Sequence, residues 1–241
     1  MIVEKNGPLR LLRFPTLRRT GIVAAVSTRP LDARLPDHQA RLADALDLDA
    51  ERIATPRQVH KAGIVKAEEG ALPPGTEADG VITDVPGQPI LMRGADCSLV
   101  IVVDPEIRAF GVAHAGWKGA ARGVVIQLVR ALEMHYGAVA SECRAAVGPT
   151  IGKERYPVGA EVTAAFLKHR SWAREFIDVA NGTLRLDLAG VNARFLVEAG
   201  IPAENIETCR LCTSENADLL HSYRRDGTDC GHHALIAAFP E

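Results

Sequence analysis

The segment RGADCSLVIVVDPEIRAFGVAHAGW, residues 93–117, contains two apolar runs separated by a short polar turn. The first run, residues 99–103, is apolar throughout, which predicts a strand buried on both faces. The link at residues 104–107 is too short for a helical crossover, so the run at residues 109–112 should return antiparallel. We therefore expect a β-hairpin at the centre of the fold.

Strands and helices are also predicted on both sides of this hairpin. The further strands are expected at residues 22–27, 80–83, 89–92, 144–147 and 234–239. Apolar residues at helical spacing predict helices at about residues 37–46, with Asp37 as N-cap, and at 119–136, 159–169 and 188–199. Because strands cluster between residues 80 and 113 without intervening helices, we expect an α/β fold of layered mixed β-sheets flanked by helices. One domain should span residues 1–241.

Composition excludes several classes of protein. The chain has 241 residues, 47% of them hydrophobic, which is ample for one large core. Its 28 basic and 30 acidic residues give a net charge of −2, without the basic excess of a nucleic-acid binder. No apolar run reaches the roughly 20 residues of a membrane span, and no signal peptide is visible. Five cysteines, an odd number, then predict reduced thiols in a cytoplasm.

Three segments end in a soft metal ligand or nucleophile, and they supply His60, Cys97 and His114. Two of these segments follow predicted strands, whose ends hold side chains rigidly. One thiol and two imidazoles suit Zn²⁺ with an open fourth position. Alternatively, Cys97 could be a nucleophile with His114 as its base. The separations of 37 and 17 residues do not resemble a zinc finger, so spacing alone leaves both readings open, together with simple burial in the core.

Seven motifs in a fixed order carry a resemblance to a known family. They are RQVH (57–60), EADGVITDVPG (77–87), RGADCSLVIVVDP (93–105), VAHAGWKGAARGVV (112–125), AAVGPTIG (145–152), YPVGAEV (156–162) and SYRRDG (222–227). From about residue 55 onward the chain resembles the YfiH family, also called the laccase-domain or multicopper polyphenol oxidase domain family. The resemblance implies a layered α/β fold with mixed sheets, and a zinc site formed by His60, Cys97 and His114.

The same resemblance implies a purine nucleoside substrate. Family members are described as cleaving adenosine and inosine with phosphate and as deaminating adenosine, and others as oxidising phenols or editing peptidoglycan. We expect a zinc-dependent purine nucleoside phosphorylase with adenosine deaminase as a second activity, and small-molecule nucleoside and phosphate as its partners. A laccase needs a multi-histidine copper cluster, but this chain has 8 histidines and no His-x-His pair, so zinc is favoured over copper. A cysteine hydrolase, a polyphenol oxidase and a peptidoglycan editing factor stay as alternatives.

Additional residues are candidates for these reactions. In deamination, Asp96 would accept or relay a proton after water attacks C6 of adenine; the alternative of equal weight is a surface or turn carboxylate. In phosphorolysis, cations must converge on phosphate, and the candidates are Arg57, Lys118, Arg224 and Arg225. Neighbouring side chains in an extended segment diverge, so at most one of Arg224 and Arg225 should enter the pocket.

Overall fold

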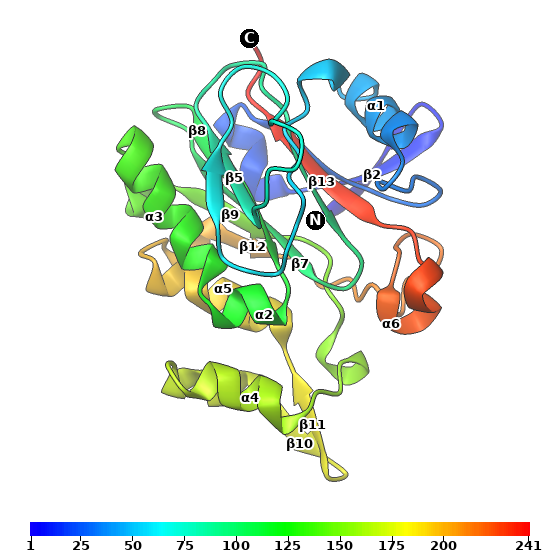
Figure 1. Cartoon of the computed structure of the whole chain (residues 1–241), viewed down its shortest axis with the longest axis vertical. Helices are drawn as coiled ribbons and strands as arrows, with labels where there is room; N and C mark the ends of the chain where they lie inside the picture. The colour runs from blue at the N-terminus through cyan, green and yellow to red at the C-terminus, as the bar shows by residue number, and fades with distance from the viewer.

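The computed structural model describes residues 1–241 and contains two large β-sheets (Figure 1). The six-stranded sheet has the order β12-β9-β7-β8-β5-β4 and the five-stranded sheet the order β1-β2-β3-β13-β6. The strands are β1 (Ile2–Asn6), β2 (Leu9–Arg13), β3 (Val23–Ser27), β4 (Ile64–Lys66), β5 (Gly80–Thr83), β6 (Ile90–Gly94), β7 (Ser98–Asp104), β8 (Ala109–Ala115), β9 (Arg144–Val147), β10 (Ile177–Ala180), β11 (Thr183–Leu186), β12 (Ile206–Thr208) and β13 (His233–Ala238). Strands β10 and β11 form a separate two-stranded sheet.

Helices cover the outer faces of the two large sheets. The α-helices are α1 (Pro36–Asp44), α2 (Trp117–Ala121), α3 (Val124–Tyr136), α4 (Ala160–Leu167), α5 (Leu188–Glu198) and α6 (Tyr223–Asp226). The 3-10 helices are η1 (Pro15–Thr20), η2 (Ala50–Arg52), η3 (Ala140–Glu142), η4 (Lys153–Arg155), η5 (Ser171–Phe176), η6 (Ala203–Asn205) and η7 (Gly227–Asp229). Helix α4 and the β10–β11 hairpin lie together at the bottom of Figure 1. None of the helices is long and apolar enough to cross a lipid bilayer.

Strand β7 shows why the layers form. All seven of its residues are buried, as its apolar sequence predicts. Alternate side chains point to opposite faces: Val100 and Val102 join the core beneath α3 and α5, whereas Leu99 and Ile101 join the core between the sheets. A third core lies between the five-stranded sheet and α1. The predicted α/β architecture of layered mixed sheets with flanking helices is therefore confirmed.

The predicted hairpin is also confirmed. Strands β7 and β8 pair antiparallel, from Ser98 opposite Ala115 to Asp104 opposite Ala109. This register places the residue before β7 beside the end of β8. Two pairs in the same sheet, β4 with β5 and β9 with β12, run parallel, which makes the sheet mixed.

Two helix predictions need correction. The single helix expected over residues 119–136 is divided into α2 and α3, because Gly123 has a φ of 79° and is left-handed. The apolar spacing continues across this break and so conceals it. Helix α1 begins at Pro36 with Leu35 as N-cap, so the predicted cap Asp37 instead lies in the first turn. The sequence also gave no indication of β1, β2, β4, β10, β11 or β12.

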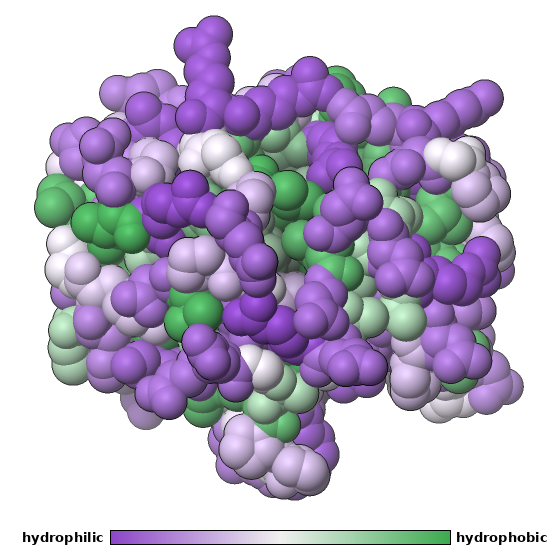
Figure 2. All heavy atoms as spheres, turned by 90° about the horizontal axis from the view of Figure 1, so that it is seen from above, coloured by the Kyte–Doolittle hydropathy of each residue, from purple (hydrophilic) through white to green (hydrophobic).

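The surface is mostly polar on the face seen in Figure 2. Hydrophobic residues appear there in small separate groups between hydrophilic side chains. Scattered exposure of this kind is normal for a globular protein.

The buried side chain of His233 should make the folded protein less stable in acid. Its side chain is fully buried, and neither ring nitrogen has a hydrogen-bond partner. Burial, with nearby His221 and His232, lowers its pKa from 6.5 to about 3. Below pH 6.5 the histidine is therefore protonated in the unfolded chain but stays neutral in the native state. As the pH decreases, this difference lowers the free energy of unfolding by about 1.4 kcal/mol per pH unit.

Replacing His233 by leucine should remove this contribution. Between pH 6.5 and 5, we expect urea unfolding of the chelator-treated variant to show about 2 kcal/mol less loss of stability than the parent chain. At pH 7 the substitution should be nearly neutral, because it removes two unsatisfied polar atoms from the core. Equal acid losses in the two proteins would contradict this role for His233.

Candidate metal centre

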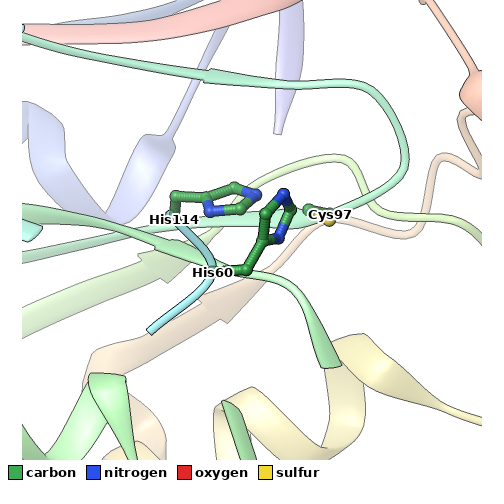
Figure 3. A group of neighbouring side chains, drawn as sticks. All are labelled: His60, Cys97 and His114. Carbon is green, nitrogen blue, oxygen red and sulfur yellow. The ribbon is translucent and has the colours of Figure 1, made fainter. Parts of the chain in front are cut away.

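His60, Cys97 and His114 converge in space (Figure 3). Their potential ligand atoms all lie within 4.8 Å of one another. His114 lies near the end of β8, Cys97 directly precedes β7, and His60 comes from the loop before β4. The hairpin register brings Cys97 to His114, because Leu99 is opposite His114. The two imidazole rings meet edge to face, with centroids 4.7 Å apart.

The donor set fits a soft divalent cation. Zinc bonds of about 2.0–2.1 Å to nitrogen and about 2.3 Å to sulfur put tetrahedral ligand atoms roughly 3.3–3.6 Å apart. The three donors here would close on an ion by small side-chain movements. His114 is buried, Cys97 is half-buried and His60 is exposed, so one side of the group is open. Three protein ligands with an open side are the arrangement of a catalytic zinc site.

Asp79 organises this group, although it was not among the residues predicted for the site. Its side chain is fully buried, and its Oδ1 accepts a hydrogen bond from His114 Nδ1 at 3.0 Å. The same carboxylate accepts from the backbone N–H groups of His60 (3.0 Å) and Lys61 (2.6 Å). One carboxylate therefore leaves His114 Nε2 free for the centre and fixes the loop that carries His60. Its position in the EADGVIT motif, directly before a buried strand, was the available signal.

The electrostatics of the group favour a cation. Burial alone would lower the pKa of His114, but its interactions with Cys97 and Asp79 outweigh burial and raise that pKa to about 9. Positive charge is thus stabilised where the three donors meet. Burial, followed by the charges of His114 and Lys118, lowers the pKa of His60. A neutral imidazole keeps the lone pair that a metal needs.

Gly116 provides the space for the sulfur. A β-carbon added at Gly116 would lie 2.6 Å from Cys97 Sγ, which is well inside contact distance. We expect Gly116→Ala to displace the thiolate and weaken zinc binding by about 10-fold or more, measured by competition with a chromophoric chelator. Gly63→Ala is the matched control, because a β-carbon there meets open space. Equal zinc affinity in both variants would contradict the tight packing of Gly116 on the sulfur.

The three residues lie in the wall of a cavity of about 660 Å³. Arg57, Lys118 and Arg224, which were predicted to bind phosphate, also line it. Arg225 is not brought to the cavity. Its guanidinium instead pairs with Asp226 and donates to the carbonyl oxygens of Thr213 and Leu220, both at 2.9 Å. Only one of the two neighbouring arginines enters, as expected. The expected extended segment is wrong, because both arginines lie on the short helix α6, where successive side chains also point in different directions.

Asp96 lines the cavity beside Cys97, but both of its oxygens already accept hydrogen bonds. The donors are the Thr213 hydroxyl at 2.5 Å and the backbone N–H of Arg224 at 2.6 Å. Asp96 therefore ties the segment around Arg224 to the Cys97 loop. Its part in proton transfer stays a prediction.

Aromatic side chains form another part of the wall. Trp117, Tyr156 and Tyr223 line the cavity, and Trp117 and Tyr156 also pack against the core beneath the six-stranded sheet. The guanidinium of Arg224 lies 5.2 Å from the Tyr156 ring centroid. Sequence reasoning missed several further lining residues, which come from distant segments: Arg34, Gln58, Arg93, Thr228, Cys230 and His232.

Two relatives with named activities are similar to this chain. A protein from Deinococcus radiodurans named purine nucleoside phosphorylase is 34% identical over 247 residues, covering 96% of this chain and 94% of that protein. A protein named adenosine deaminase RL5, from an unknown prokaryotic organism, is 31% identical over 84% of this chain and 79% of its own length.

Solved structures share the fold along the whole chain. The crystal structure of the Bacillus licheniformis hypothetical protein YfiH matches with a TM-score of 0.88 and 27% identity, covering 98% of both chains. That of YlmD from Geobacillus stearothermophilus has a TM-score of 0.87 and 25% identity, covering 100% of this chain and 99% of that one.

The sequence model of one family, described as multi-copper polyphenol oxidoreductase laccase, matches residues 27–239. This range includes all three converging donors and most of the chain. The resemblance expected from the sequence motifs is thereby confirmed, and the chain belongs to the multi-copper polyphenol oxidoreductase laccase family.

Proposed function

We propose that this chain is a zinc-dependent purine nucleoside phosphorylase that acts on adenosine or inosine. The observation that carries the proposal is the convergence of His60, Cys97 and His114 in the wall of a cavity that also holds several cationic side chains. The name of the Deinococcus relative, which matches nearly the whole chain, supports the same reaction. We expect neither nucleic acid nor a membrane to take part in it.

Each part of the cavity would have its own task. The aromatic rings of Trp117 and Tyr156 offer faces on which a purine can stack. Arg57, Lys118 and Arg224 would attract phosphate electrostatically. In the reaction, a phosphate oxygen forms a bond to C1′ of ribose while the bond from C1′ to the purine nitrogen breaks, and the base leaves with a proton. When bound, zinc supplies Lewis acidity at the open side of the three donors.

Metal analysis combined with base release tests this function. We expect about one zinc per chain, and release of hypoxanthine from inosine that depends on added phosphate and yields ribose 1-phosphate. Stoichiometric zinc without base release at any phosphate concentration would remove phosphorolysis from the account.

Adenosine deamination is a second candidate, because the chain also matches a relative named adenosine deaminase RL5. Water would replace the 6-amino group, which leaves as ammonia, and inosine would form. Asp96 is the carboxylate beside Cys97 that would handle the proton. Ammonia release from adenosine without phosphate measures this activity separately, and its absence would exclude it.

Two alternative activities, a cysteine hydrolase and a copper-dependent phenol oxidase, each have a supporting observation. The donor set contains Cys97 next to His114, which is also the pair that a cysteine hydrolase would use. The description of the family names copper and polyphenols, so the metal analysis includes copper and the assay includes oxygen uptake with a phenol. If the protein contains copper at full occupancy and oxidises the phenol, the proposed zinc enzyme is wrong and the site is a copper site. A peptidoglycan editing role has no support in these residues.

A further inference from the structure

Arg93 is a half-buried cation in the same cavity without a partner in the protein. It lies on β6, and its backbone is fixed by Gln58, whose side chain accepts from Arg93 N at 2.9 Å and donates to Arg93 O at 2.8 Å. Its guanidinium forms no ion pair or hydrogen bond with another residue, and burial lowers its pKa. Arginine stays charged in proteins, so a guanidinium in this position carries a desolvation cost that an anion would offset.

The other cations of the cavity are already satisfied or solvated. Arg57 pairs with Glu77, and Arg34 pairs with Asp32. Arg224 donates to the carbonyl oxygen of Pro157 at 3.3 Å, and the exposed Lys118 is free to be hydrated. Arg93 therefore differs from all four, because its side chain is half-buried and its guanidinium has no acceptor in the protein.

His232 provides a second donor beside Arg93. It lines the cavity, and its Nδ1 is buried with no hydrogen-bond partner. Burial, with the charges of Arg34 and Arg93, lowers the pKa of His232 to about 4. Arg93 is paired with Ala234 across β6 and β13, two residues along the chain from His232, and both side chains line the cavity. A neutral ring has one N–H, and placing it on Nε2 avoids a buried unsatisfied donor at Nδ1.

We propose that Arg93 and His232 form a binding subsite for a phosphate group within this cavity. A planar guanidinium that can donate two parallel hydrogen bonds, together with a ring N–H, suits a tetrahedral oxyanion. That the bound phosphate acts as a co-substrate rests on the proposed phosphorylase function. That Arg93 and His232 bind phosphate does not depend on that function. The phosphate group comes either from inorganic phosphate or from the 5′-phosphate of a nucleotide, and the two share the same recognition chemistry.

Calorimetric titration of the zinc-loaded protein with inorganic phosphate and, separately, with AMP tests the subsite. We expect Arg93→Gln to weaken binding by about 10- to 100-fold, as for loss of hydrogen bonds to a charged group. Arg19→Gln is the matched control, because Arg19 is exposed on η1, outside the cavity, and loses the same charge. Binding of inorganic phosphate identifies the co-substrate, and binding of AMP alone identifies a nucleotide phosphate. Equal affinities in Arg93→Gln and the parent protein would overturn the proposal.

Chemical modification of the unaltered protein gives an independent readout if Arg93→Gln fails to fold. Phenylglyoxal modifies accessible arginines, and peptide mass analysis locates each adduct. We expect phosphate or AMP to slow modification of Arg93 at least about 5-fold while Arg19 reacts unchanged, since a bound anion covers the guanidinium. Arg93 reacting at the same rate with and without both ligands would overturn the subsite. A protein that passes this test but releases no base from inosine would keep the subsite and lose the phosphorylase function.

Discussion

Replacing His60 by alanine is expected to lower zinc affinity and phosphorolysis each on the order of 1,000-fold, beyond the 10- to 100-fold typical of residues that only support a ligand. The reason is that His60 is one of only three protein donors in the group, and two donors hold zinc poorly. Zinc affinity is measured by chelator competition, and turnover by hypoxanthine release.

This substitution also separates the metalloenzyme from the cysteine hydrolase. A Cys97 nucleophile with a His114 base does not require His60, so the hydrolase account predicts retained turnover in His60→Ala and rapid alkylation of Cys97 in metal-free protein. His135→Ala is the matched control, because His135 is an exposed histidine on α3. Full zinc affinity and full turnover in His60→Ala would contradict the three-donor site.

The second large effect is expected for Asp79→Asn. The amide keeps the size of the side chain, but only one of its ends accepts hydrogen bonds, whereas the carboxylate accepts from His114, His60 and Lys61. The orientation of His114 and the loop carrying His60 should both be disturbed. We expect zinc affinity to fall by about 10- to 100-fold and the free energy of unfolding by about 1–3 kcal/mol.

Zinc titration and urea unfolding of the same preparations separate these two consequences. Asp84→Asn is the matched control, since Asp84 is an exposed aspartate directly after the same strand, β5. If Asp79→Asn loses stability but binds zinc like the parent protein, Asp79 supports the fold and not the metal centre.

The features that depend on local sequence were predictable. The β7–β8 hairpin follows from continuous apolar runs and a link too short for a helix, and α5 follows from its spacing, the Asp187 cap and Gly200. The three candidate metal ligands were recognised from motifs, because their separations along the chain carry no signal of their own.

The features that depend on long-range contacts were not predictable. Asp79 acquires its role only when the His60 loop folds over β5, and Arg93 and His232 line the same cavity because β6 pairs with β13. Sequence reasoning expected at most one of Arg224 and Arg225 in the pocket but could not decide which one. The carbonyl and Asp226 contacts of Arg225 hold it away from the cavity. Arg93 differs from the other arginines of the cavity in its burial and in its lack of a hydrogen bond or ion pair. Both properties depend on the three-dimensional structure.

The most direct test of the metal centre is a crystal structure of the zinc-supplemented protein, with anomalous diffraction recorded on both sides of the zinc absorption edge. We predict a single anomalous peak bonded to Cys97 Sγ at about 2.3 Å and to one ring nitrogen each of His60 and His114 at about 2.0–2.1 Å. A peak that vanishes below the zinc edge identifies the ion. The absence of density between these three side chains, or a peak that appears only at the copper edge, would contradict the zinc site.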